Sequence, residues 1–293
     1  MSEPKLIKRC GFAWGPFAPN LHSISPYIGC PFDCSYCWSK MMAHRFHREP
    51  LGGWRNVQVN PFFNTPNDHS YHHLYNEDRL KQEAVRIRDK GGTILIGATC
   101  DPYPPLEKST NLTLDILADL SDMDDLRVLV LTKSPIACRD WELFKALDAQ
   151  VGFTLTAPAG VDTSFWEPHA PSNASRIAAL KFLHSKGVRT FVSIEPWLVV
   201  AKWTLKTGEW FMNITLPACI VKETARFVDY YIVGSWNVAG KPKKALVPYY
   251  KMALPGVIEA LERLNPGAYW IKKELGGILD NPLLKGKGGG ETR

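Results

Sequence analysis

The sequence predicts an α/β fold: a partial (β/α)6 TIM-type barrel of parallel strands, with an N-terminal cysteine loop and a short C-terminal extension. From about residue 92, short apolar runs alternate with helical stretches. Strands and helices that alternate in this way form βαβ units and a parallel sheet. Polar residues follow each apolar run, and functional residues of parallel barrels lie at these strand ends. Six core strands, rather than eight, leave such a barrel open on one side.

The strands are predicted from short apolar runs that are rich in β-branched residues. These runs lie at 22–28, 93–99, 127–132, 150–156, 189–194 and 229–234, with a candidate seventh at 268–271. Between them, apolar residues recur at helical spacing. The helices are expected at 110–120, 140–147, 172–186, 217–227 and 249–264. Thr110 is expected to cap the first helix and Gly187 to stop the third.

We expect a barrel domain over residues 1–240, a helical C-terminal extension over 241–284 and a flexible tail over 285–293. Residues 47–78 interrupt the alternation and are rich in Asn, Pro, His and aromatic residues. We interpret them as an insertion that forms a lid over the barrel mouth. The tail is rich in Gly and Lys, a composition typical of flexible segments.

Composition and cysteine usage are those of a soluble globular protein. Apolar residues make up 45% of the 293 residues and charged residues 22%, so the chain can bury a sizeable core. No segment approaches the roughly 18 apolar residues of a membrane helix, and no signal-peptide core follows Met1. Seven cysteines, three of them clustered, favour a reducing compartment over a disulfide framework. We therefore expect a cytoplasmic protein without a membrane partner.

Three cysteines, Cys30, Cys34 and Cys37, lie within eight residues, and no fourth is nearby. A structural zinc site has four protein ligands and a closed coordination shell, whereas iron–sulfur clusters are held by cysteine thiolates. A 4Fe–4S cluster with three protein ligands leaves one iron open to a small molecule, so the pattern indicates a chemically active cluster. The alternative is a zinc knuckle completed by a distant cysteine, His44 or His47, although these spacings fit the usual zinc motifs poorly.

The spacing C-x3-C-x2-C, with Tyr36 just before the last cysteine, resembles the radical S-adenosylmethionine (radical SAM) superfamily. This resemblance implies that the open iron of a 4Fe–4S cluster binds S-adenosylmethionine (SAM). It also implies an external one-electron reductant, flavodoxin-like or ferredoxin-like. SAM would then be cleaved to methionine and a 5′-deoxyadenosyl radical, which abstracts hydrogen from a substrate. Tyr36 would lie beside the SAM adenine, or pack over the cluster.

Further segments, in order along residues 24–200, resemble the spore photoproduct lyase-like branch of this superfamily. They are Tyr-Ile-Gly-Cys at 27–30, Thr-Cys-Asp-Pro-Tyr-Pro-Pro-Leu-Glu at 99–107, Leu-Thr-Lys-Ser at 131–134, Arg-Asp at 139–140, Glu-Pro at 167–168, Pro171 and Arg176. Ser-Ile-Glu-Pro at 193–196 and Ile-Val-Gly-Ser at 232–235 also resemble phage-associated radical SAM proteins. The resemblance implies radical SAM machinery and leaves the substrate open.

Cys100 departs from the branch, whose members commonly carry threonine in this motif. In the DNA-repair lyase, a cysteine in this neighbourhood returns a hydrogen atom to the product radical. The register differs, so Cys100 is a candidate hydrogen donor by resemblance only. The alternative is a small buried hydrophobic residue at a strand end, because free cysteine is often buried.

The remaining candidate SAM-binding residues follow predicted strands. Lys133 is a point positive charge suited to the SAM carboxylate, and Ser134 would add a hydrogen bond. Asp101 and Glu195 would bind the amino group or the ribose hydroxyls, and Thr99 completes this group of strand-end residues. For each of them the alternative is a salt bridge at the barrel rim or a helix cap.

We therefore predict a radical SAM enzyme, lyase-like or modifying, with an unidentified substrate. Nucleic acid is one candidate, because the net charge of +6 permits it, although a mildly basic enzyme fits that charge as well. No aromatic and basic stripe for opening a duplex is evident.

The alternative function is a non-enzymatic iron–sulfur or zinc protein that interacts with nucleic acid. Three clustered histidines, His69, His72 and His73, are interpreted as a solvated loop, and Arg176 as structural.

Overall fold

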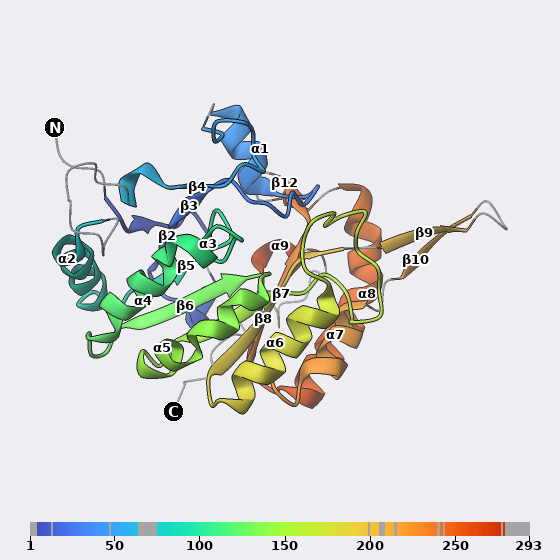
Figure 1. Cartoon of the computed structure of the whole chain (residues 1–293). Coiled ribbons are helices and arrows are strands. Elements are labelled where there is room, and N and C mark those ends of the chain that lie inside the picture. The colour runs from blue at the N-terminus through green and yellow to red at the C-terminus, as the bar shows by residue number, and fades with distance from the viewer. Residues whose placement is uncertain are drawn as a thin grey trace.

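A computed structural model describes residues 5–12, 14–46, 48–63, 75–198, 200–204, 209–213, 216–238, 241–242, 244–276 and 278. In this part of the chain, eight strands form one sheet (Figure 1). In spatial order they are β1 (Lys8–Arg9), β2 (Leu21–Ile24), β5 (Thr93–Ile96), β6 (Arg127–Thr132), β7 (Gln150–Thr154), β8 (Arg189–Trp197), β11 (Tyr230–Ser235) and β14 (Tyr269–Ile271). All neighbours from β2 to β14 pair in parallel, and β1 adds an antiparallel edge. The predicted α/β partial barrel is confirmed, and the candidate seventh strand joins it as β14.

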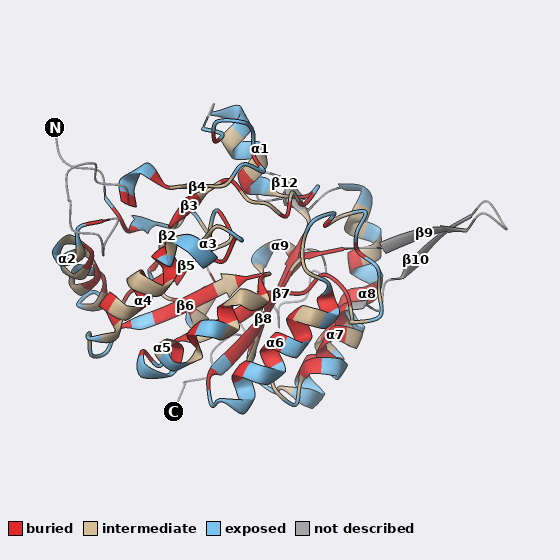
Figure 2. Ribbon diagram, viewed as in Figure 1, coloured by how far each residue is buried: buried red, intermediate tan, exposed pale blue. Residues whose placement is uncertain are grey.

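Helices cover the outer face of the sheet (Figure 1). These helices are α2 (Glu77–Arg88), α4 (Leu112–Ser121), α5 (Trp141–Ala146), α6 (Asn173–Ser185), α7 (Leu216–Thr224) and α8 (Val247–Leu264). They bury apolar residues at helical spacing, such as Ile116 and Leu120 of α4, in the main core. Their exposed residues point away from the sheet, as the colours of Figure 2 show. The five predicted helices are confirmed, with ends that differ by a few residues.

The N-terminal segment packs on the other face of the sheet. Trp14 and Phe17 lie against Phe191, with ring centroids 5.8 and 5.3 Å apart, and Phe17 stacks on Tyr230 at 4.1 Å. Strand alternation explains why this second core exists, since successive side chains point to opposite faces. Leu129 faces the N-terminal segment, whereas its two neighbours in β6 join the main core.

The predicted strand 22–28 divides into two. Its first part is β2, whereas β3 (Tyr27–Ile28) pairs antiparallel with β4 (Gln58–Val59) outside the large sheet. Pro26 lies between them and has no N–H to donate to a continuous ladder. Its carbonyl accepts from the Asn60 N–H at 2.8 Å. Part of the predicted insertion therefore lies beside the segment that leads into the cysteines.

Other parts of the predicted insertion and tail lie outside the described residues. These parts include residues 64–74, with His69, His72 and His73, and the tail 285–293. The division of the chain into domains, and the role of 47–78 as a lid, stay predictions.

The predicted N-cap at Thr110 is wrong. α4 begins later, after Asn111, which adopts a left-handed conformation with a φ of 50°. The buried carboxylate of Glu107 accepts hydrogen bonds from the N–H groups of Thr113 and Leu114, at 2.9 and 3.2 Å. Glu107 therefore satisfies the first turn of α4, the role that a capping side chain usually fills.

Besides four short 3-10 helices, the remaining elements of the described part of the chain are α1 (Trp38–Arg45), α3 (Glu107–Thr110), α9 (Lys273–Gly276), and the antiparallel pairs of β9 (Val200–Thr204) with β10 (Glu209–Asn213) and of β12 (Asn237–Val238) with β13 (Lys241–Pro242). The apolar patterns do not predict these two strand pairs. None of the described helices has both the length and the apolar character needed to cross a membrane.

Gly152 of β7 lies where a side chain would collide with the core, because a Cβ there would come within 2.3 Å of the Phe191 ring. We expect Gly152→Ala to lower the free energy of unfolding by about 1–3 kcal/mol, as overpacked cores do. Urea unfolding measures this change. Gly160→Ala is the matched control, since a Cβ at Gly160 meets no atom within 4 Å. Equal stability of the two variants would contradict the packing around Gly152.

Candidate functional site

The cysteine loop begins at Gly29, directly after β3. Gly29 has a φ of 79°, and a Cβ there would lie 2.6 Å from the carbonyl oxygen of Trp54. The Cys30 N–H donates to this same carbonyl at 2.9 Å. The positive φ and the close approach both require glycine. The loop is therefore attached to the segment that precedes β4, and the first cysteine has a fixed place.

The structure brings the three predicted ligands together. Cys34 is buried, and Cys30 and Cys37 are partly buried. All three belong to one small apolar cluster, separate from the main core, and its other members are Phe32, Tyr36, Trp166, Ala170, Leu198 and Trp236. The Cys37 N–H donates to the Cys34 carbonyl at 3.1 Å, and the Cys37 sulfur accepts from the Lys40 N–H at 3.4 Å, at the start of α1. The three thiols thus share one apolar environment.

The other cysteines lie elsewhere. Cys100 packs in the main core, Cys10 packs on the second core, and Cys138 donates to the Ala179 carbonyl at 3.8 Å. Within the described ranges, no set of three or more His, Cys, Asp or Glu side chains is arranged to hold a single metal ion. Three thiols in an apolar cluster, with no fourth ligand among the residues that the structure describes, fit an iron–sulfur cluster with one open iron better than a closed tetrahedral zinc site.

Lys133 directly follows β6, and its ammonium lies over the Tyr36 ring, 5.6 Å from the ring centroid. Burial alone would lower the pKa of Lys133, but Cys34 and Glu167 raise it above its ordinary value. Burial raises the pKa of the Cys34 thiol, and the Lys133 charge opposes that rise. Among the residues that the structure describes, the ammonium has no hydrogen-bond or ion-pair partner. It is a partly buried positive charge beside the thiols, suited to binding an anion.

Asp101 holds the ends of two neighbouring strands together. Its carboxylate accepts from the Thr132 hydroxyl and the Lys133 N–H, both at 2.7 Å, and from the Tyr103 N–H at 2.9 Å. Burial raises the pKa of Asp101, although these hydrogen bonds oppose the rise. Asp101 therefore fixes the point at which Lys133 leaves β6. Its predicted contact with SAM stays a prediction.

Glu195 lies in β8 and forms an ion pair with Lys272, which follows β14. Its other carboxylate oxygen accepts from the Ser193 hydroxyl at 3.1 Å. This is the salt-bridge arrangement that the sequence left open as the alternative for Glu195. Its contact with SAM likewise stays a prediction.

The last three predicted site residues have local partners. Thr99 and Ser25 share a hydrogen bond between their hydroxyls at 2.6 Å. Ser134 is buried, and its N–H donates to the Thr132 hydroxyl at 2.8 Å. Cys100 donates to the Tyr27 carbonyl, and burial raises the pKa of its thiol to about 12. Cys100 thus belongs to the main core and not to the apolar cluster that holds the other three thiols.

Glu167 and Arg176 belong to the segments that resemble the lyase-like branch, but the sequence does not predict that they hold Tyr36. The Tyr36 hydroxyl donates to the buried carboxylate of Glu167, which forms an ion pair with Arg176 at 2.6 Å. Burial would raise the pKa of Glu167, but the charges of Arg176 and Lys133 lower it below its ordinary value. One signal was available, since Arg176 lies four residues before Leu180 on the buried face of α6. A charge on such a face needs a buried partner.

At the carboxyl ends of strands, two further side chains carry buried hydroxyls that have no hydrogen-bond partner within the described residues. They are Thr156, just beyond β7, and Ser235, the last residue of β11. Buried polar groups normally find a partner, so these two hydroxyls are exceptions among the strand-end residues. Neither residue is among the predicted cofactor-binding residues.

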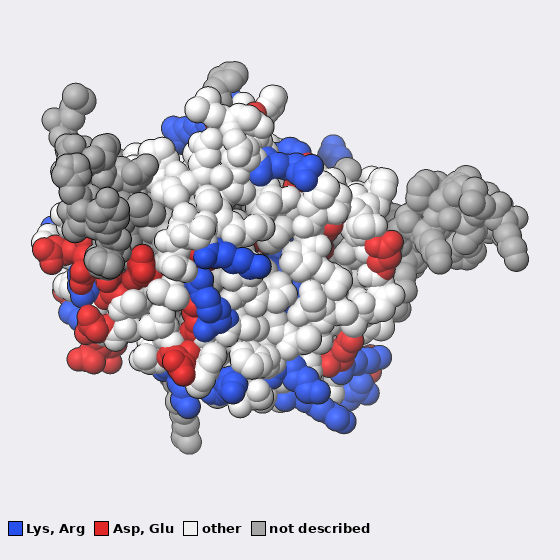
Figure 3. All heavy atoms as spheres, in the orientation of Figure 1, with Lys and Arg blue, Asp and Glu red and all other residues white. Residues whose placement is uncertain are grey.

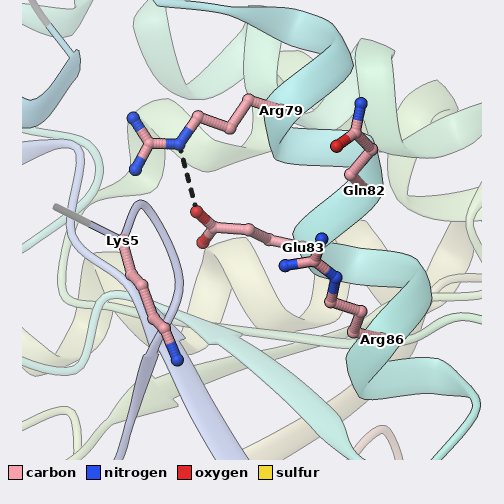
Figure 4. Close-up of a pocket in the computed structure, with 5 residues that line it drawn as sticks. All are labelled: Lys5, Arg79, Gln82, Glu83 and Arg86. Atoms are coloured by element: carbon pink, nitrogen blue, oxygen red, sulfur yellow. Dashed lines mark hydrogen bonds and ion pairs between the residues drawn. The ribbon is translucent and has the colours of Figure 1, made fainter. Parts of the chain in front are cut away.

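A pocket opens between the N-terminal segment and α2 (Figure 4). It is lined by Lys5, Arg79, Gln82, Glu83 and Arg86. Glu83 pairs with Arg79 at 3.2 Å and accepts from the N–H groups of Leu6 and Ile7, at 3.3 and 2.8 Å. These contacts attach the N-terminal segment to α2, so we interpret the pocket as structural.

No family model matches the chain. The uncharacterized protein MJ0683 of Methanocaldococcus jannaschii is 31% identical to it over 174 residues. The match covers 59% of this chain and 59% of that protein, so it concerns only part of each.

Spore photoproduct lyase complexed with dinucleoside spore photoproduct superposes with a TM-score of 0.60, over 90% of this chain and 79% of that chain, at 14% identity. The chain has the fold of spore photoproduct lyase. A mutant of that lyase with bound AdoMet and dinucleoside spore photoproduct gives a TM-score of 0.59 over 90% and 78% of the chains, at 14% identity. SuiB of Streptococcus suis bound to S-adenosylmethionine gives 0.52 over 86% of this chain and 50% of that chain, at 12% identity. The resemblance predicted from the sequence is confirmed for the fold.

Proposed function

We propose that this protein is a radical SAM enzyme in which Cys30, Cys34 and Cys37 hold a 4Fe–4S cluster whose open iron binds SAM. When bound and reduced, the cluster supplies an electron that cleaves SAM to methionine and a 5′-deoxyadenosyl radical, which abstracts hydrogen from a substrate. One observation carries the proposal: the Lys133 ammonium, which has no hydrogen-bond or ion-pair partner in the described part of the chain, lies beside three thiols that share one apolar cluster.

The chain's own residues would orient SAM. Lys133 supplies the positive charge for the SAM carboxylate, and Asp101 positions that lysine through its backbone N–H. The unpaired hydroxyls of Thr156 and Ser235 add polar groups at strand ends on the same rim. Direct contacts of SAM with Asp101, Glu195, Thr99, Ser134 and Tyr36 are part of this proposal.

The aromatic residues around the thiols would keep water away from the reaction. The Trp166 and Trp236 rings meet edge-on at 5.3 Å, and Trp236 meets Tyr36 at 6.4 Å. A dry surrounding helps to set the potential of an iron–sulfur cluster. It also protects a reactive intermediate from side reactions.

The substrate is unidentified, and nucleic acid is one candidate. Two of the compared lyase structures hold a dinucleoside spore photoproduct. On the face drawn in Figure 3, however, the described basic side chains form separate groups rather than one stripe for a duplex.

We further propose an external one-electron reductant, flavodoxin-like or ferredoxin-like, and a cytoplasmic location in which the thiols stay reduced.

Electron paramagnetic resonance of the anaerobically reconstituted chain tests the proposal. Reduction with dithionite should give the spectrum of a reduced 4Fe–4S cluster, and SAM should change its g values, because SAM binds the open iron. A spectrum that SAM leaves unchanged would contradict the proposal. A chain that retains zinc in place of iron would instead support a non-enzymatic metal protein.

We expect Lys133→Met to weaken SAM binding about ten- to hundredfold, because a hydrogen bond to a charged group contributes about 1.5–3 kcal/mol. Its iron content should stay that of the wild type, since Lys133 is not a cluster ligand. A titration of the reduced cluster with SAM measures the affinity. Lys181→Met, on the exposed side of α6, is the control. Equal SAM affinity of Lys133→Met and the wild type would remove Lys133 from the SAM site.

Cys100→Ala is expected to keep the iron content and the rate of SAM cleavage of the wild type, because the Cys100 thiol lies in the main core. A hydrogen-donor role would appear only after hydrogen abstraction. Cys100→Ala should then alter the product, or its deuterium incorporation in heavy water, once a substrate is known. An unchanged product with full turnover would remove that role.

A further inference from the structure

We propose that the buried Glu167–Arg176 pair positions the turn that carries Cys34 and Cys37, and that it does so before any metal or cofactor is bound. The pair acts through Tyr36, which lies between these two cysteines. Glu167 and Arg176 are therefore positioning residues.

Arg176 provides the fixed end of this connection. Its side chain is fully buried, with 0% exposed. The guanidinium donates to the Pro171 carbonyl at 2.8 Å, to the Thr154 carbonyl at 3.0 Å, and to both carboxylate oxygens of Glu167 at 3.3 and 2.6 Å. Thr154 is the last residue of β7. Several charge-assisted hydrogen bonds must break together before this group can move, so it is anchored to the barrel.

Glu167 connects Arg176 to Tyr36 and thereby fixes the position of the Tyr36 side chain. Its carboxylate accepts from the Tyr36 hydroxyl on one side and pairs with Arg176 on the other. Its backbone N–H donates to the Thr163 carbonyl at 2.8 Å, which fixes the main chain as well. If Tyr36 moved away, a buried charged oxygen would lose a hydrogen bond, and such a loss is costly.

A second contact runs beside the first. Ser35 donates to the Trp166 carbonyl through its N–H at 2.9 Å and its hydroxyl at 3.3 Å. The Trp166 ring packs on Trp236, which also meets Tyr36. Two consecutive residues of the cysteine turn are therefore bound to two consecutive residues of the segment that precedes α6.

Two consequences follow from this arrangement. The cysteine turn keeps its conformation in the metal-free protein, because the contacts that hold it involve protein groups. The Tyr36 ring is also held under the Lys133 ammonium, which should favour SAM binding, and this second consequence rests on the proposed function. A site that is ordered in advance loses less conformational freedom when its ligand binds.

Thiol labelling of the full-length, metal-free chain tests the first consequence. N-ethylmaleimide is added to the native protein, and the labelling rate of each cysteine is measured by peptide mass spectrometry. Cys34 is only 7% exposed in the intact turn. We expect it to react at least about tenfold faster in Tyr36→Phe and in Glu167→Gln, because each variant removes or weakens a hydrogen bond to a charged group. The double variant should react no faster than the faster single variant, because both changes break one connection.

A matched pair elsewhere in the chain supplies the control. Tyr75 donates to Asp119, and both residues are buried, as Tyr36 and Glu167 are. Tyr75→Phe and Asp119→Asn should change the Cys34 labelling rate by less than about twofold, since distant sites act independently. Cys138 in the same samples reports general unfolding. An unchanged Cys34 rate in Tyr36→Phe and Glu167→Gln would overturn the proposal. An equal rise in the control variants, or at Cys138, would also overturn it, because the effect would then be general loss of stability.

SAM affinity of the reconstituted variants tests the second consequence. Tyr36→Phe and Glu167→Gln should bind SAM about tenfold more weakly at wild-type iron content, whereas Tyr75→Phe and Asp119→Asn should bind it as the wild type does. A wild-type chain that takes up no cluster would refute the proposed function and leave the labelling result intact. A wild type that binds SAM, with no change in Cys34 labelling among the variants, would refute only the positioning role.

Discussion

Alanine at Cys30, Cys34 or Cys37 is expected to abolish cluster binding, so that the reconstituted chain falls from about four iron atoms to nearly none. In the proposed site each cysteine would supply one of three protein ligands, and all three lie in one apolar cluster. A cluster that is held by only three protein ligands is not expected to stay bound after one of these ligands is lost. The iron content and visible absorbance of anaerobically reconstituted protein measure this loss.

The other partly buried cysteines are the controls. Alanine at Cys10, Cys138 or Cys219 should leave the iron content of the wild type, because these residues lie outside that apolar cluster. Full iron in Cys34→Ala, or loss of iron in Cys138→Ala, would contradict the assignment of the ligands.

Arg176→Met is expected to lower the free energy of unfolding by roughly 3–5 kcal/mol, because it leaves a buried carboxylate without its charge partner. The side chains of Arg176 and Glu167 are 0% and 1% exposed. Urea unfolding followed by circular dichroism measures the change. Arg189→Met is the matched control: its partner Asp148 is exposed, so this variant should cost no more than about 1 kcal/mol. An equal decrease in the free energy of unfolding of the two variants would contradict the larger contribution of the buried pair.

The pH dependence of stability gives an independent check on the same pair. The folded-state pKa of Glu167 lies below its ordinary value, because Arg176 and Lys133 outweigh its burial. The stability that this carboxylate contributes is therefore fully present above the ordinary glutamate pKa, and it is lost as the pH falls through the lower, folded-state pKa. In Arg176→Met the partner is gone, so the stability difference from the wild type should shrink in acid. A difference that stays constant with pH would contradict the assigned pairing.

The strands and long helices could be predicted because apolar periodicity determines which faces are buried. The prediction of a helix start fails where a side chain from another segment makes the contact that the local residue was expected to make. Thr110 has the right chemistry for a cap, but the short helix α3 brings the Glu107 carboxylate to the first turn of α4. Pro26 divides a predicted strand because the backbone donor of a continuous ladder is missing.

Motif spacing and strand ends predict that the three cysteines lie together and that Lys133 lies near them, as the structure has it, whereas their roles as ligands stay predictions. Local sequence does not reveal side-chain partners that come from distant segments. Glu195 has the charge expected of a SAM ligand, yet it is paired with Lys272. The bond between Tyr36 and Glu167 joins residues that are 131 positions apart, so no local pattern contains it.

The formation of 5′-deoxyadenosine from SAM tests the central claim most directly. SAM and dithionite are added to the reconstituted chain under anaerobic conditions, and the product is quantified by liquid chromatography and mass spectrometry. Slow cleavage without a substrate makes the assay independent of the unknown target. The wild type is expected to release 5′-deoxyadenosine and methionine, and Cys34→Ala none above a protein-free background. An iron-loaded wild type that forms no more 5′-deoxyadenosine than Cys34→Ala would contradict radical SAM chemistry at this site.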